Sequence, residues 1–315
     1  MIILEAAGCG ALVESCGIRP GASWGTANAT VQAQYRASNC NVKICVYWKK
    51  KNSVVPFVTY GSLSADLQPL WDLPRNGDGQ TCNELSGRLS LTECSAVSER
   101  CNLLALVSSG SATPNVLALF SSSGCDTSIC TVWRRRYGVT PYVSYGSLPD
   151  SYKASWDAVR ASSNKTCNDL AGLLDSSECG ALVETYGIVP GSSWGSAGAN
   201  VQGLYTASFC NRSVCAYWRT KYSVVPFLGW GSLPHALQNA WNFARQPAGQ
   251  TCNELSGSLT ASDCEALQLA YGIVAFGGWG TAPTNVQRMW NSSKCDMHAC
   301  RKMVFPVPNC QIYLG

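Results

Sequence analysis

Pairs of cysteines separated by four residues mark this sequence, as in FCNRSVCAYW at residues 209–218. Cysteines at such spacing can bind zinc, cycle between thiol and disulfide, or form structural bridges. A zinc site needs four ligands, but His235 and His298 do not recur at equivalent places beside the pairs. The sequence also has no Cys-x-x-Cys redox motif. We therefore expect structural disulfides, with no metal and no cofactor.

Composition and cysteine usage indicate an oxidising compartment. The 315-residue chain has 18 cysteines but only 13% charged residues, compared with about 25% in typical soluble domains. An even and dense set of cysteines is typical of secreted proteins, because the cytosol keeps thiols reduced. We expect an extracellular glycoprotein, either secreted or part of a cell-surface appendage. The candidate glycan acceptors in Asn-x-Ser/Thr sequons are Asn28, Asn164, Asn211 and Asn291.

The cysteines recur with a constant spacing of 85 residues that no insertion interrupts. Tryptophans and the tripeptide Gly-Ser-Leu keep the same spacing. No flexible or proline-rich spacer separates the copies, so each is expected to meet the next in the same way, as in a quasi-one-dimensional array. The predicted repeats are residues 1–93, 94–178, 179–263 and an incomplete 264–315.

Local signals within each repeat predict helices, so the expected fold class is all-α. Capping boxes begin a first helix at Ser90, Asp175 and Thr260, each followed three residues later by Glu or Asp. A second helix follows the signals at Thr113 and Thr281, with proline in its first turn. A third helix ends in basic residues, and a short fourth helix follows the Gly-Ser-Leu signal. The expected N-caps of the third helix are Asn41, Asp126, Asn211 and Asp296.

The cysteine spacing leaves the disulfide pairing open. Cys210 and Cys215 flank a predicted helix start, which allows a local bridge. Five residues also rotate a side chain by about 140° around a helix, which allows each cysteine a distant partner. Four cysteines permit three pairings, of which we expect Cys9 with Cys45 and Cys40 with Cys82. The same pattern predicts Cys94–Cys130, Cys125–Cys167, Cys179–Cys215, Cys210–Cys252, Cys264–Cys300 and Cys295–Cys310, and leaves Cys16 and Cys101 to pair with each other or to link chains.

The segment APTNVQRMWNSSKCDMHACRKMVFPVPNCQI at 282–312 places a Pro-Thr helix start before a cysteine pair and a Pro-Asn-Cys turn after it. These residues resemble the elicitins and elicitin-like proteins of oomycetes, although the first three repeats lack the cysteine of that turn. The resemblance implies small secreted helical domains that hold a sterol or another lipid in a cavity. Large aromatic side chains must also fill the core of a repeat. The candidate lipid-contacting residues are Trp48, Phe57, Trp71, Trp133, Tyr142, Trp156, Trp218, Phe227 and Trp241.

Charged residues recur as well, but they do not indicate catalysis. Helix capping explains Glu93, Glu178 and Asp263, and catalytic acid–base groups need to converge in a pocket. We expect no catalytic residues and no enzymatic activity, although Glu84, Asp169 and Glu254 also recur. The basic runs at 49–51 and 134–136 fall at predicted helix ends, where they compensate the helix dipole. Alternatively, they form a ladder of positive patches for an acidic polysaccharide or a partner chain.

We expect a structural protein that forms an extracellular rod, coat or filament. The first and last repeats are incomplete in complementary ways, either because copies join head-to-tail or because the chain is part of a longer array. Head-to-tail contacts that do not close produce filaments. A net charge of +4 does not indicate a nucleic-acid partner, and no stretch approaches the roughly 18 apolar residues of a membrane span. The alternative is an elicitin-like protein that binds one sterol or lipid per repeat.

Overall fold

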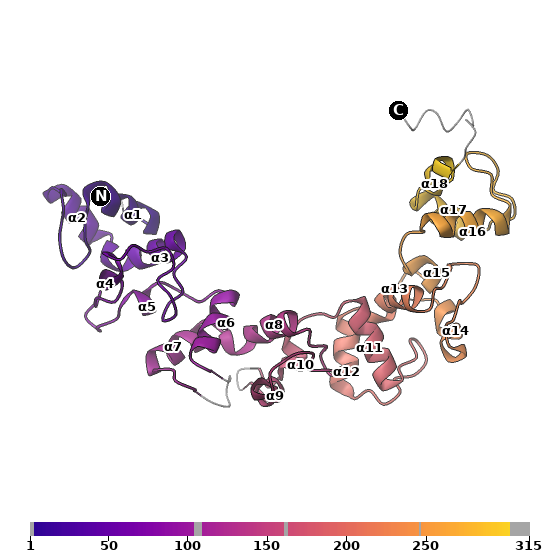
Figure 1. Ribbon diagram of the computed structural model, residues 1–315, viewed down its shortest axis with the longest axis horizontal. Helices are drawn as coiled ribbons and strands as arrows, with labels where there is room; N and C mark the ends of the chain where they lie inside the picture. The colour runs from indigo at the N-terminus through magenta and orange to yellow at the C-terminus, as the bar shows by residue number, and fades with distance from the viewer. Residues whose placement is uncertain (1–2, 104–108, 161–162, 246, 303–315) are drawn as a thin grey trace. The chain divides into compact units, whose positions relative to one another are not determined.

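A computed structural model describes residues 3–103, 109–160, 163–245 and 247–302. Within these ranges the predicted all-α fold class is confirmed: the chain forms 18 helices, and its β features are isolated bridges inside turns (Figure 1). Two compact units divide the chain, Met1–Ala171 and Gly172–Gly315. The boundaries of the four repeats remain a prediction.

The helices fall into five sets whose members occupy equivalent places in successive repeats. The first set is α1 (Ala6–Cys16), α6 (Leu91–Arg100), α11 (Ser176–Tyr186) and α16 (Ala261–Tyr271). The second set is α2 (Ala29–Ala37), α7 (Pro114–Ser122), α12 (Ala199–Ala207) and α17 (Thr284–Ser292). The third set is α3 (Cys40–Asn52), α8 (Cys125–Tyr137), α13 (Cys210–Lys221) and α18 (Cys295–Lys302). The fourth and fifth sets are short: α4 (Gln68–Trp71), α9 (Asp150–Asp157), α14 (His235–Asn242), α5 (Cys82–Leu85), α10 (Cys167–Leu170) and α15 (Cys252–Leu255).

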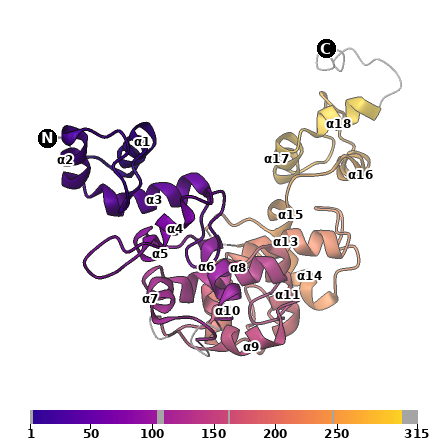
Figure 2. The same cartoon turned by 60° about the vertical axis from the view of Figure 1, so that its left-hand side comes forward.

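The first and third helices of each repeat pack against each other, as α1 with α3 and α16 with α18 show (Figures 1 and 2). In the third repeat a glycine allows this approach, because a Cβ on Gly180 would lie 2.1 Å from the ring of Tyr217. The cores form around the disulfides and buried tryptophans. Trp133 and Trp218, for example, are fully buried.

The capping boxes predicted for the first helices are confirmed. Ser90, Asp175 and Thr260 each accept a hydrogen bond from the backbone N–H three residues on, and the acidic side chain there reaches back to the cap. Each box satisfies backbone donors that a helix start otherwise leaves unpaired. A local signal of four residues is therefore enough to place these helix starts.

The N-caps predicted for the third helices are wrong. The helices α3, α8 and α13 begin at the cysteine itself, and their N-caps are Asn39, Gly124 and Phe209, all in the left-handed conformation. A sharp turn from the second to the third helix needs a positive φ, whereas the usual N-cap is extended. Asn41 instead donates from Nδ2 to the backbone oxygen of Arg75 at 2.8 Å.

The predicted disulfide pairing is also wrong. In the first repeat the bridges are Cys9–Cys40 and Cys45–Cys82, with sequence separations of 31 and 37 residues. Because α1 packs along the start of α3, it meets Cys40, while Cys45 faces the neighbouring α5 about 140° further round the helix. The same pairing recurs as Cys94–Cys125, Cys130–Cys167, Cys179–Cys210, Cys215–Cys252 and Cys264–Cys295.

The remaining cysteines differ in what the structure says about them. Cys16 and Cys101, which we predicted to pair with each other or to link chains, are free thiols. Cys16 is partly exposed and Cys101 is buried, and burial raises the pKa of the Cys101 thiol. The side chain of Cys300 and the whole of Cys310 lie outside the described residues.

Candidate functional sites: two pockets and two repeat junctions

The tryptophans that we named as candidate lipid contacts lie in the repeat cores. Their exposed fractions are 2% or less, and Trp71 and Trp241 each donate an indole N–H to Oδ1 of an asparagine, Asn83 and Asn253, at 2.8 and 2.9 Å. The hollows lined by Phe57 with Trp71 and by their second-repeat counterparts Tyr142 and Trp156 measure 160 and 130 Å³. Ligand pockets usually measure about 300–1,000 Å³, so these hollows are small for a sterol. The tryptophans are Trp48, Trp71, Trp133, Trp156, Trp218 and Trp241.

The other three aromatic candidates have an unusual backbone. Phe57, Tyr142 and Phe227 have φ angles of 64°, 64° and 68°, a region that bulky residues avoid. The backbone N–H of Phe57 donates to Asn83 Oδ1 at 2.9 Å, and that of Phe227 donates to Asn253 Oδ1 at 2.8 Å. Each of these asparagines therefore holds both the strained residue and a core tryptophan.

The strained phenylalanines lie at junctions between successive repeats. In the first unit, Phe57 packs against the hydrophobic core of the second repeat. In the second unit, Phe227 packs against the core of the fourth repeat, and its carbonyl accepts a hydrogen bond from Tyr271 Oη at 3.0 Å. The aromatic side chain of one repeat thus completes the core of the next.

An ion pair also crosses each of these two junctions. In the first unit, Lys49 Nζ lies 3.0 Å from Glu93 Oε2, and each side chain is 13% exposed. In the second unit, Arg219 pairs with Asp263, and their side chains are 12% and 10% exposed. Arg219 Nη1 also donates to the backbone oxygens of three consecutive residues, Ser256, Gly257 and Ser258.

The recurrent charged residues therefore have structural partners. Glu84, Asp169 and Glu254 form capping boxes with Thr81, Thr166 and Thr251, one set that capping had not been expected to explain. The first residue of a basic run points into a junction, as Lys49 and Arg219 do. The third pairs with the first helix of its own repeat: Lys51 with Glu14, Arg136 with Glu99 and Lys221 with Glu184. The runs are therefore not a ladder of unpaired positive patches.

The four sequons lie in different surroundings. Asn28, Asn164 and Asn291 are exposed. Asn28 caps α2 by accepting a hydrogen bond from the backbone N–H of Val31 at 3.0 Å. Asn211 lies in the first turn of α13, is partly buried, and has a buried Oδ1 with no hydrogen-bond partner.

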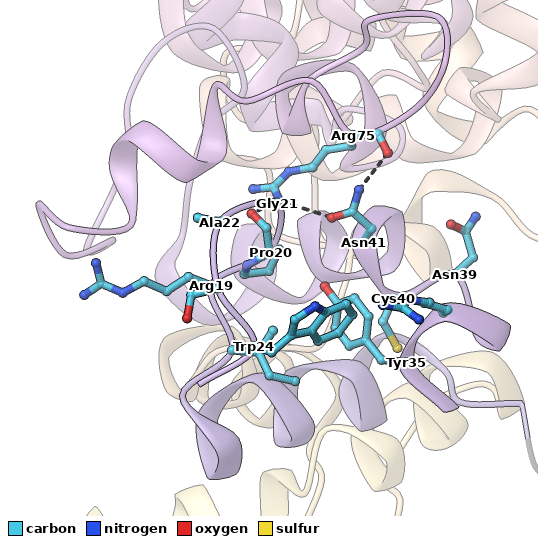
Figure 3. A pocket seen from close by; sticks show the side chains of 13 residues that line it. Arg19, Pro20, Gly21, Ala22, Trp24, Tyr35, Asn39, Cys40, Asn41 and Arg75 are labelled. Atoms are coloured by element: carbon cyan, nitrogen blue, oxygen red, sulfur yellow. Dashed lines mark hydrogen bonds between the residues drawn. The ribbon is translucent and has the colours of Figure 1, made fainter. Parts of the chain in front are cut away.

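Two pockets of about 490 Å³ each occupy equivalent places in the first and third repeats. The first is lined by the loop that follows α1, by Tyr35 of α2, by Asn41 of α3 and by Arg75 (Figure 3). The rings of Trp24 and Tyr35 meet edge to face, with centroids 5.5 Å apart. Arg36 lies over the Trp24 ring at 4.9 Å. Sequence reasoning missed this pocket, because its lining comes from four separate segments.

The third-repeat pocket keeps the aromatic pair and replaces the basic residues. Trp194 and Tyr205 meet at the same 5.5 Å centroid distance. Thr206 stands where the first repeat has Arg36, and Phe209 stands where it has Asn39. Trp194 and Phe209 are 41% and 69% exposed. The same scaffold therefore carries a basic pocket in one repeat and an aromatic pocket in the other.

Both pockets contain buried polar groups without partners. Tyr35 and Tyr205 are each 3% exposed, and neither hydroxyl has a hydrogen-bond partner. Burial raises the pKa of Tyr35 to about 12 and also raises the pKa of Tyr205. Burial lowers the pKa of Arg245 to about 10, and its guanidinium donates to the backbone oxygens of Asn211, Phe243 and Ala240. At neutral pH both tyrosines are therefore neutral, and Arg245 remains charged.

Among the residues that the structure describes, no three histidine, cysteine or acidic side chains form a group that fits a metal ion. None of the described helices has the length and hydropathy needed to cross a membrane. Comparisons with protein-family models, with curated proteins and with solved structures found no match in any of the three sets. The resemblance of the last repeat to the elicitins therefore rests on the residues of that segment alone.

Proposed function

We propose that this chain is a secreted structural protein, a load-bearing component of an extracellular rod or coat that is built from disulfide-stapled helical repeats. The junctions carry this proposal. At each of the two described junctions a strained phenylalanine enters the core of the next repeat, and a shielded ion pair crosses beside it. Strained residues persist only where the surrounding packing compensates for them, which is expected where the angle between repeats must be held.

The disulfides support the same proposal. Cys9–Cys40 and Cys45–Cys82 close two loops that together cover most of the first repeat. Under tension only the segments outside these loops, between Cys40 and Cys45 and between Cys82 and Cys94, can extend. Disulfides at this density also favour an oxidising, extracellular location.

Self-association into filaments needs a contact other than a copy of the internal junction. Gly8 stands in the first repeat where Glu93 and Asp263 stand in the second and fourth. A basic residue from another copy would therefore find no carboxylate there. Lipid binding at the predicted aromatic residues is less favoured by the geometry, because the adjoining hollows measure only 130 and 160 Å³.

Single-molecule pulling from the two ends tests the load-bearing role. We expect the oxidised chain to lengthen by less than roughly a third of the extension of the chemically reduced chain, since the closed loops cannot open. The variant with Cys45 and Cys82 both changed to serine should gain the length of one loop. Equal extension before and after reduction would contradict the proposal.

Electron microscopy and lipid titration separate the alternatives. Rods or filaments that assemble from the purified oxidised chain support the structural role and add self-association to it. Saturable binding of one sterol per repeat, with particles that remain discrete, favours the elicitin-like alternative instead.

A further inference from the structure

We infer that the third-repeat pocket is a binding site for a saccharide ring. Its mouth carries two exposed aromatic side chains, Trp194 and Phe209. A third, Phe243, is 42% exposed and leans on the pocket wall, where a Cβ on Gly191 would lie 2.3 Å from its ring. Exposed aromatic faces gathered around a hollow are typical of ligand sites.

The backbone at Phe209 supports a functional reading. Phe209 has a φ of 54°, and the residues at its position in the other repeats, Asn39, Gly124 and Lys294, also have positive φ. Asn and Gly adopt this conformation at little cost, whereas a bulky residue is strained there. Because Phe209 is 69% exposed, packing within the repeat does not compensate for this strain. A ligand that covers the ring does.

The unpartnered polar groups indicate the class of ligand. Asn211 Oδ1 needs a donor, and the Tyr205 hydroxyl needs a donor or an acceptor; both are buried and unpaired at this pocket. A lipid tail offers neither, whereas the hydroxyls of a sugar offer both and its C–H face packs on an aromatic ring. No carboxylate lines the pocket, and the guanidinium of Arg212 already donates to Gln250 Oε1 at 3.0 Å. The chemistry therefore favours a neutral sugar.

The other repeats show why the third is the site. In the first repeat Arg36 covers the indole of Trp24, whereas the Trp194 face beside Thr206 is not covered in this way. In the fourth repeat Trp290 replaces the tyrosine, and its indole N–H donates to Asp296 Oδ1 at 2.9 Å. An open ring face thus coincides with an unpaired buried hydroxyl in the third repeat.

Two sources can supply the sugar: an external glycan, or a glycan attached to Asn211 through its own sequon. To separate them, cellohexaose, laminarihexaose and chitohexaose are titrated against oxidised chain made in a host without N-glycosylation, with calorimetry as readout. We expect saturable binding that weakens about tenfold or more in Trp194→Ala, Phe209→Asn and Tyr205→Phe. Trp230→Ala is the matched control, because Trp230 is 42% exposed and lies outside the pocket.

These variants also separate binding from folding. Phe209→Asn installs the residue of the first repeat and removes backbone strain, and Tyr205→Phe removes a hydroxyl that has no partner. Both should fold at least as stably as the wild type while they bind sugar less tightly.

For the covalent source, the chain is secreted from a glycosylating host and compared with Ser213→Ala, which keeps Asn211 but removes the sequon. A glycan mapped to Asn211 that shifts the NMR signal of the Trp194 indole N–H supports a sugar in the pocket from that source. The inference is overturned if none of the three oligosaccharides binds and no such shift occurs, or if Trp194→Ala binds as tightly as the wild type.

Discussion

Arg219 and Asp263 form an ion pair across the junction between the third and fourth repeats, with Nη2 2.5 Å from Oδ2. The pair is largely shielded, and Arg219 also binds three carbonyl oxygens of the chain that leads into α16. One side chain thus fixes both the charge and the backbone of the next repeat. Lys49 and Glu93 do the same in the first unit, with one backbone carbonyl, that of Arg88.

Arg219→Met should lower the free energy of unfolding by about 1.5–3 kcal/mol, because it removes charge-assisted hydrogen bonds and leaves Asp263 shielded without its partner. Lys221→Met is the matched control, since its pair with Glu184 is about 40% exposed and worth about 0–1 kcal/mol. Urea unfolding of the oxidised chain at pH 7 measures both. Equal effects of the two variants would contradict a special role for the junction pair.

The effect of Arg219→Met should depend on pH. Burial by itself raises the pKa of Asp263, but hydrogen bonds from Thr260 and the charge of Arg219 hold the pKa below its ordinary value of 3.8. A lowered carboxyl pKa stabilises the fold above the ordinary pKa, and this stability is lost as the pH falls through the folded-state value. The difference in unfolding free energy between wild type and variant should therefore shrink from pH 7 to about pH 2.5. An unchanged difference would show that the carboxylate charge is not involved.

Asn253→Ala should destabilise the third repeat by about 2–4 kcal/mol, since it leaves two donors without an acceptor, the backbone N–H of Phe227 and the indole N–H of Trp241. Asn253→Asp keeps the acceptor oxygen and should cost much less. Thermal unfolding of the two variants gives the comparison. If both lose the same stability, the Oδ1 hydrogen bonds are not what holds Phe227.

Peptide mapping of the oxidised chain under non-reducing conditions should recover Cys179 linked to Cys210, and Cys215 linked to Cys252. Replacing Cys215 and Cys252 together by serine should cost about 3–4 kcal/mol, because the bridge closes a loop with a separation of 37 residues. Recovery of Cys179 linked to Cys215 would restore the pairing that we had expected from the sequence.

The two free cysteines should react with a maleimide at different rates. Cys16 is partly exposed and should be labelled in the native chain, whereas Cys101 is buried and its raised pKa leaves less of the reactive thiolate. Mass spectrometry of tryptic peptides distinguishes the two sites, and labelling in urea should make their rates similar. Native labelling of Cys101 at the rate of Cys16 would contradict its burial.

Local signals were enough to predict much of the fold. The capping boxes at Ser90, Asp175 and Thr260 begin helices as expected, because a cap depends only on residues three apart. The all-α class followed from the same signals. The cap of the third helix was missed at Phe209, because its conformation is imposed by the turn between two packed helices rather than by its own preference.

The sequence by itself therefore determined the helical class, the even spacing of the cysteines and the starts of the first helices, since these depend on neighbours along the chain. The disulfide partners, the junctions and the pockets depend on which helix faces meet. Only the packing of α1 on α3 assigns Cys9 to Cys40. Only the tertiary structure brings Trp194, Tyr205 and Asn211 from three segments to one pocket, and so turns FCNRSVCAYW from a disulfide motif into part of a candidate sugar site.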